Sequence, residues 1–241
     1  MKIRAIILSA LILCGISAVI MYSRAAQPQQ KSSVITQAIN DKNTPMVIKN
    51  LILKMKEQME VNDDQFPELI KEVENYTNSL ADSASVAVLH SMLAEMYQNY
   101  YQRNQWTINQ RTQLSGYIPE DIRVWTSNLF TDKIKEEIDL SLRPTALLQN
   151  TPVSKFKDIL EIGKDSQTLR PTLYEFLAFR ALDIQPTVQI YKDLIAFQNK
   201  EPNMKSVLLT ELDYLRFLYG DKRDKESFEA YMNALDELYR N

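Results

Sequence analysis

The sequence predicts an all-α protein, and three observations lead to this fold class. No stretch alternates apolar and polar residues at the period of two that marks a half-buried strand. Only 4 of the 241 residues are Gly, too few for the turns of a many-stranded sandwich. Apolar residues instead recur at the three- and four-residue spacing of amphipathic helices. We expect an irregular stack of antiparallel helical hairpins, about eight or nine helices in all, tetratricopeptide-like in places.

The N-terminal segment has the pattern of a secretory leader. Lys2 and Arg4 precede an uncharged, mainly apolar run over 5–23, and small residues follow that run. We expect residues 1–26 to be a signal peptide, so that the protein is exported. Because the apolar run is nearly long enough to span a bilayer, an uncleaved signal anchor is the alternative, and it would be the chain's only membrane contact.

Residues 27–43 are expected to form a spacer with a first short helix, and residues 44–241 a single α-helical domain. Thr44 followed by Pro45 predicts the start of the first long helix, with Thr44 as its N-cap. A second amphipathic segment covers 66–80. The next helix carries the clearest buried stripe, made of Leu89, Leu93, Met96 and Tyr100 at spacings of four, three and four residues.

The second half of the chain has its own helix signals. Pro119 is predicted to begin one continuous helix, with Trp125 pointing inward, that Pro144 ends. Thr172 and Glu175 have the spacing of a capping box and predict the next helix over 173–182. The last two helices are expected on either side of Gly220. Their apolar stripes are Leu208, Leu212, Leu215 and Tyr219, and then Phe228, Tyr231, Leu235 and Leu238.

Charge and residue usage exclude several classes of function. Without residues 1–26 the chain has 31 acidic residues against 25 basic ones, since Lys2, Arg4 and Arg24 are lost, so we expect no nucleic-acid partner. One Cys and one His are too few for a Cys/His zinc site, and no nucleotide-binding motif occurs. We therefore expect no metal and no cofactor.

The sequence also predicts that the protein is not an enzyme. His90, the only His, lies beside the apolar stripe, where it is expected to make one hydrogen bond at the edge of the core rather than act as a base. The adjacent acidic pairs, such as Glu136 with Glu137, are expected at helix starts or on exposed faces. A small α-helical glycan hydrolase with paired carboxylates is the enzymatic alternative.

One aromatic cluster is a candidate interaction surface. Tyr97, Tyr101 and Trp106 lie within ten positions, and Tyr and Trp are enriched where proteins bind one another. At helical spacing such residues more often belong to the core. In the polar connectors, Arg111 and Arg170 are expected to tie helices together through carboxylates or backbone carbonyls.

Three segments together resemble the N-terminal helical region of very large bacterial alpha-2-macroglobulin family proteins. They read YYQRNQW at 100–106 with NQRT at 109–112, PEDIRVWT at 119–126, and RPTLYEFLAFRALD at 170–183. The resemblance covers roughly residues 85–185. It implies an exported envelope protein from a family whose full-length members trap or inhibit proteases. The family's Cys-x-Glu-Gln thioester motif is missing, because Cys14 lies in the leader, so protease trapping does not transfer to this chain.

The expected function is therefore that of an exported, non-enzymatic helical module of an alpha-2-macroglobulin-like envelope protein. It would act through protein–protein contacts, with a separate protein or with other domains of a larger chain. The alternative is a free-standing periplasmic helical-repeat adaptor that binds a peptide or an envelope protein on a concave aromatic face.

Overall fold

The computed structural model describes residues 43–61, 64–112, 116–160, 165–200, 203–220 and 224–240. The predicted signal peptide and nearly all of the predicted spacer lie outside these ranges. The chain forms two compact units, residues 1–54 and 55–241, and the architecture described below is that of the second unit.

The all-α prediction is confirmed for the described part of the chain. Its eight helices of eleven or more residues agree with the predicted eight or nine. No strand occurs in the described ranges, where a single isolated bridge joins Pro152 and Thr172. The α-helices are α2 Thr44–Val61, α3 Phe66–Ser79, α4 Ser83–Ile108, α5 Ser127–Ser141, α6 Thr145–Gln149, α7 Ser166–Leu169, α8 Leu173–Ile184, α9 Val188–Gln198, α10 Met204–Tyr219 and α11 Lys225–Arg240.

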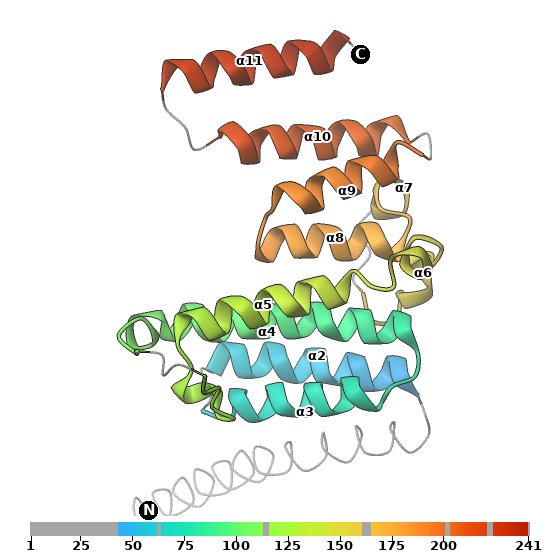
Figure 1. Cartoon of the computed structure of the whole chain (residues 1–241). Coiled ribbons are helices and arrows are strands. Elements are labelled where there is room, and N and C mark those ends of the chain that lie inside the picture. Colours follow the sequence, from blue (N-terminus) through green and yellow to red (C-terminus); the bar gives the residue numbers. More distant parts are fainter. Residues whose placement is uncertain are drawn as a thin grey trace, which may run out of the picture. The chain divides into compact units, whose positions relative to one another are not determined.

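Helices that follow one another in the chain pack side by side and reverse direction, as Figure 1 shows for α3, α4 and α5 and again from α8 to α11. Helix α8 also contacts α4 and α6. Arg180 of α8 holds the first of these contacts, because its guanidinium donates to Ser91 Oγ at 2.9 Å and to Glu95 Oε2 at 2.6 Å. The two sets of hairpins are thereby joined through α4 and α8.

The structure moves one predicted helix cap by a residue. The Asn43 side-chain oxygen accepts from the Met46 backbone N–H at 3.2 Å, so Asn43, and not Thr44, caps α2. Thr44 is already helical, which puts Pro45 at the second position of the helix. Both positions lie in the first turn, where a proline costs no backbone hydrogen bond.

The continuous helix predicted from Pro119 is wrong. The chain forms a short 3-10 helix, Ile122–Val124, then extends at Trp125, and α5 begins only at Ser127. Two side-chain contacts hold the break. The Trp125 ring N–H donates to the Pro119 carbonyl at 2.6 Å, and Arg111 donates to the Trp125 carbonyl at 2.8 Å. The predicted ties of Arg111 and the inward position of Trp125 are confirmed.

The capping box at Thr172 and Glu175 is confirmed, and α8 follows it directly. Helix α9 was not predicted as a separate element, although Thr187 caps it through the Ile190 N–H.

The apolar stripe predicted for α10 is only partly right. Leu208 is exposed, and the buried face is carried by Val207, Ser206 and Thr210.

Candidate functional site

The three aromatic residues proposed as an interaction surface do not form one surface. Tyr97 is only 1% exposed; its ring stacks on Trp125 and its hydroxyl donates to Glu74 Oε1 at 2.7 Å. Tyr97 is therefore a core residue, which corrects the prediction. Tyr101 is half-buried against Phe130, whereas Trp106 is 80% exposed. Five helical residues separate Tyr101 from Trp106, so their side chains point about 140° apart around α4.

A buried carboxylate joins α4 to α5, contrary to the prediction that the Glu136–Glu137 pair lies on an exposed face. Glu137 is 2% exposed. One of its oxygens lies 2.7 Å from His90 Nδ1, and the other lies 2.8 Å from Lys133 Nζ. The hydrogen bond expected for His90 at the edge of the core is this contact with Glu137. The sequence did hold a signal for Glu137, since it lies three residues after the buried Ile134 on the same helical face.

The polar cluster around Glu137 extends through Lys133. Burial lowers the pKa of the Lys133 ammonium, but its hydrogen bonds and attraction to Glu137 and Glu136 outweigh burial and raise the pKa overall. Lys133 also lies 3.9 Å from Glu74, the acceptor of the Tyr97 hydroxyl. Glu137 is 2% exposed and each of its oxygens already has a protein partner, so the cluster gives a substrate no access to this carboxylate. We assign the cluster to holding α5 on α4.

The candidate site in unit 55–241 is a groove of about 870 Å³, which we call the α5–α9 groove. Its lining comes from α5, α6, α8 and α9 and the loops that follow α5, α8 and α9. Apolar side chains from these elements line it, namely Ile138, Leu142, Tyr174, Ile190 and Phe197. A volume of this size is typical of ligand-binding clefts.

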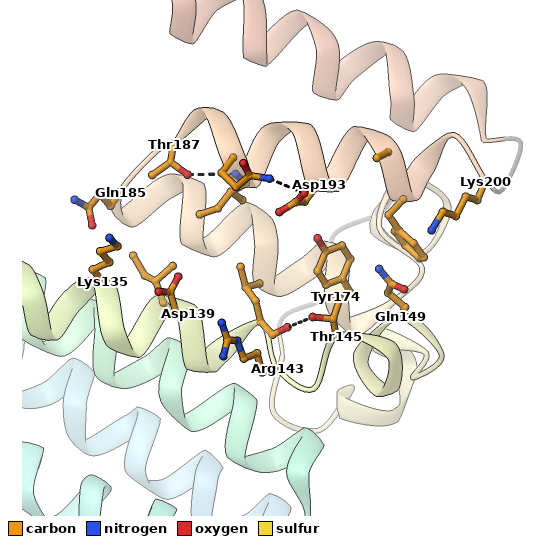
Figure 2. A pocket seen from close by; sticks show the side chains of 16 residues that line it. Lys135, Asp139, Arg143, Thr145, Gln149, Tyr174, Gln185, Thr187, Asp193 and Lys200 are labelled. Carbon is orange, nitrogen blue, oxygen red and sulfur yellow. Dashed lines mark hydrogen bonds between the residues drawn. The ribbon is translucent and has the colours of Figure 1, made fainter.

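Charged side chains edge the groove on two sides. Figure 2 shows Lys135, Asp139 and Arg143 following one another along the α5 side, with Asp193 on the α9 side and Lys200 at one end. Residues 135, 139 and 143 are four apart, so they share one face of the helix and the segment that continues it. The groove therefore has an apolar lining with charged rims.

The three cations of the rim are available to a ligand. Lys135, Arg143 and Lys200 form no ion pair with any residue that the structure describes. Of the two rim carboxylates, Asp193 accepts a hydrogen bond from the Gln189 amide at 2.8 Å. The rim carries three positive and two negative charges, an excess of one positive charge.

Tyr174 contributes a hydroxyl group to the groove lining. It projects from α8, with 4% of its surface exposed, and its ring meets Phe197 edge-on at a centroid distance of 5.2 Å. Burial, with a smaller contribution from the Asp193 carboxylate, raises the pKa of Tyr174 to about 12. The hydroxyl is thus a proton donor at neutral pH, and it has no hydrogen-bond partner within the described residues.

Arg170, expected to join helices through an oxygen acceptor, instead contacts a ring. Its guanidinium carbon lies 3.7 Å from the centroid of the Phe179 ring, a cation–π contact. Burial, which outweighs the attraction of nearby carboxylates, lowers the pKa of Arg170.

Two further features, a metal-binding cluster and a membrane-spanning helix, do not occur in the part of the chain that the structure describes. The described residues contain no group of three or more His, Cys, Asp or Glu side chains arranged to hold a metal ion. Within the same ranges, no helix has the length and apolar character needed to cross a bilayer.

Comparisons with protein-family models, with curated proteins and with solved structures find no match to this chain.

Proposed function

We propose that this chain is an exported, non-enzymatic helical module that acts through protein–protein contacts, as the front part of an alpha-2-macroglobulin-like envelope protein. The observation that carries the proposal is the α5–α9 groove, which offers an apolar lining and unpaired charged rims on a rigid helical frame. Protein-binding sites combine a central apolar contact with a polar rim in this way. The leader pattern and the three resembling segments support export and the family.

The absence of an enzyme's machinery at this groove fits the same proposal. Its lining holds no His, Cys or Ser, and its carboxylates, Asp139 and Asp193, stand on the exposed rims beside cations and amides. Binding, rather than acid–base chemistry, is what the groove's residues support.

Site-specific photo-crosslinking in the envelope tests the proposal. A photoreactive phenylalanine analogue replaces Gln189 on the groove rim, and a matched variant carries it at Asn78, an exposed position on α3 outside the groove. We expect an envelope-protein adduct, or an adduct with another domain of the same protein, only from position 189. Equal adducts from both positions, or none from either, would contradict binding through the groove.

The same cells test export and the leader. A shortened chain in the periplasmic fraction, beginning near residue 26 or 27, is expected if the leader is cleaved. A full-length chain in the membrane fraction is the result expected of the uncleaved anchor. A full-length chain in the cytoplasmic fraction would overturn the export part of the proposal without affecting the crosslinking result.

A further inference from the structure

The residues that line the α5–α9 groove indicate which class of ligand it can bind. Building on the function proposed above, we propose that it binds an extended peptide segment carrying carboxylate side chains. Three independent features of the groove lead to this ligand class: a tyrosine hydroxyl without a protein acceptor, its dimensions and its charge.

The first feature is the Tyr174 hydroxyl. The Tyr174 side chain as a whole is 4% exposed, its hydroxyl oxygen stays accessible at the groove, and within the described residues that hydroxyl has no acceptor. A ligand that displaces water from this hydroxyl keeps the hydrogen bond only if it brings an acceptor of its own. The backbone carbonyls of a helix are already engaged within the helix. An extended segment presents free carbonyl oxygens along its length.

The second feature is the length of the two sides. Along α5 from Lys135 to Ser141, six residues rise about 9 Å, and Arg143 extends this side beyond the end of the helix. Along α9 from Gln189 to Phe197, eight residues rise about 12 Å. About four residues of extended chain fit this distance at roughly 3.3 Å per residue.

The third feature is hydrogen-bonding capacity combined with charge. Gln149 and Gln185 line the groove at its two ends in Figure 2, and each amide offers both a donor and an acceptor, as a peptide backbone does. Lys135, Arg143 and Lys200 supply cations without carboxylate partners in the described part of the chain. Arg143 is the strongest of these, because a guanidinium binds a carboxylate with two parallel hydrogen bonds.

These features define the bound arrangement. Alternate side chains of an extended segment point to opposite faces, so apolar side chains lie against Ile190 and Phe197 while the intervening acidic side chains face the rim cations. A carbonyl of the segment accepts the Tyr174 hydroxyl proton in a hydrogen bond. Salt weakens the contacts at the exposed rim more than those at the groove's centre.

Fluorescence polarisation with the full chain tests this ligand class. The probe is a labelled pool of capped heptapeptides that alternate Asp or Glu with Leu, Ile, Val or Phe. Two control pools keep the apolar positions and replace the acidic ones with Asn or Gln, or with Lys or Arg. We expect saturable binding of the acidic pool, weakened by added salt, and at least about tenfold weaker binding of both control pools.

Two variants locate the binding, each with a matched control. Tyr174→Phe removes only the hydroxyl and is expected to weaken binding of the acidic pool about fivefold. Its control is Tyr191→Phe on α9, a buried tyrosine outside the groove lining. Arg143→Gln is expected to weaken binding about tenfold, and its control is Arg216→Gln, an exposed arginine of α10. All four substitutions are conservative, so each variant is expected to keep the melting temperature of the unchanged chain. That measurement confirms that a loss of binding is not a loss of folding.

The possible outcomes separate this inference from the proposed function. The inference is overturned if no pool binds, if the three pools bind equally, or if neither Tyr174→Phe nor Arg143→Gln weakens binding beyond its control. An adduct from position 189 alongside any of these results keeps a protein partner at the groove but refutes an acidic extended segment. Binding of the acidic pool with no adduct in cells supports the groove's chemistry and refutes the proposed cellular role.

Discussion

Trp125 should be a principal stabilising residue of the α3–α5 region, and its removal gives the sharpest test of the structure. The side chain is 9% exposed. Its ring stacks on Tyr97 with centroids 5.7 Å apart and lies 5.3 Å from the Phe130 ring. Its ring N–H also holds the break before α5 by donating to the Pro119 carbonyl. Trp125→Ala therefore removes packing, ring contacts and a hydrogen bond together.

The expected loss follows from these contacts. A buried aromatic side chain removes about 200 Å² from water, worth about 5 kcal/mol at roughly 25 cal/mol per Å² as an upper bound. Substituting Ala keeps part of that burial, while the lost hydrogen bond adds about 1 kcal/mol. We expect Trp125→Ala to lower the free energy of unfolding by about 4 kcal/mol, within the usual range for large core aromatics. For a chain of this size the melting temperature would fall by about 8–16 °C.

Urea unfolding followed by circular dichroism measures the effect. The second tryptophan is a natural control, because Trp106 is 80% exposed and Trp106→Ala should change stability by no more than about 0.5 kcal/mol. In a Trp106→Phe background, the fluorescence of Trp125 alone should be blue-shifted and should redden on unfolding. The structural reasoning is refuted if Trp125→Ala costs less than about 1 kcal/mol, or if both alanine variants cost the same.

The other predictions concern the buried polar groups and a helix cap. Burial and the hydrogen bond to Glu74 raise the pKa of Tyr97, so the folded chain keeps a proton that the unfolded chain releases near pH 10.0, the ordinary value for a tyrosine. Stability should therefore fall above about pH 10, by up to about 1.4 kcal/mol per pH unit, and urea titrations of Tyr97→Phe should show a shallower fall. Glu137→Gln should lower the free energy of unfolding, measured in urea, by about 3 kcal/mol. Glu229→Gln on α11, where the side chain is exposed, should lower it by less than about 0.5 kcal/mol. Equal losses for the two variants would contradict the burial of Glu137. Thr172→Ala should cost about 1 kcal/mol, and an unchanged melting temperature would mean that the capping box does not stabilise α8.

The boundaries that local chemistry controls were predictable from the sequence. The capping box at Thr172 and Glu175 needs only residues three apart, so its prediction required no knowledge of the rest of the fold. Pro144 likewise stops α5 through its own ring geometry. The break at Trp125 was missed because it depends on hydrogen bonds with Pro119 and Arg111, which precede it by more than the three or four residues that a helical pattern relates.

The functional residues were harder to predict because exposure depends on which helix covers which face. Tyr97 and Trp106 have similar chemistry and lie on the same helix, yet one is buried under Trp125 and the other faces solvent. The α5–α9 groove was missed altogether. Its two sides lie about fifty residues apart in the sequence, and neither side carries a recognisable motif.

The sequence by itself determined the helical class, the positions of most helices and the lack of a metal or nucleotide motif, because periodicity, caps and residue counts are local properties. The tertiary structure alone decided that Glu137 is a buried ion-pair partner and that the Tyr174 hydroxyl lies unpaired in a groove with unpaired cations on its rim. The reason is physical: burial and pairing are set by contacts between distant segments, and a helical pattern is the same whichever neighbour covers it.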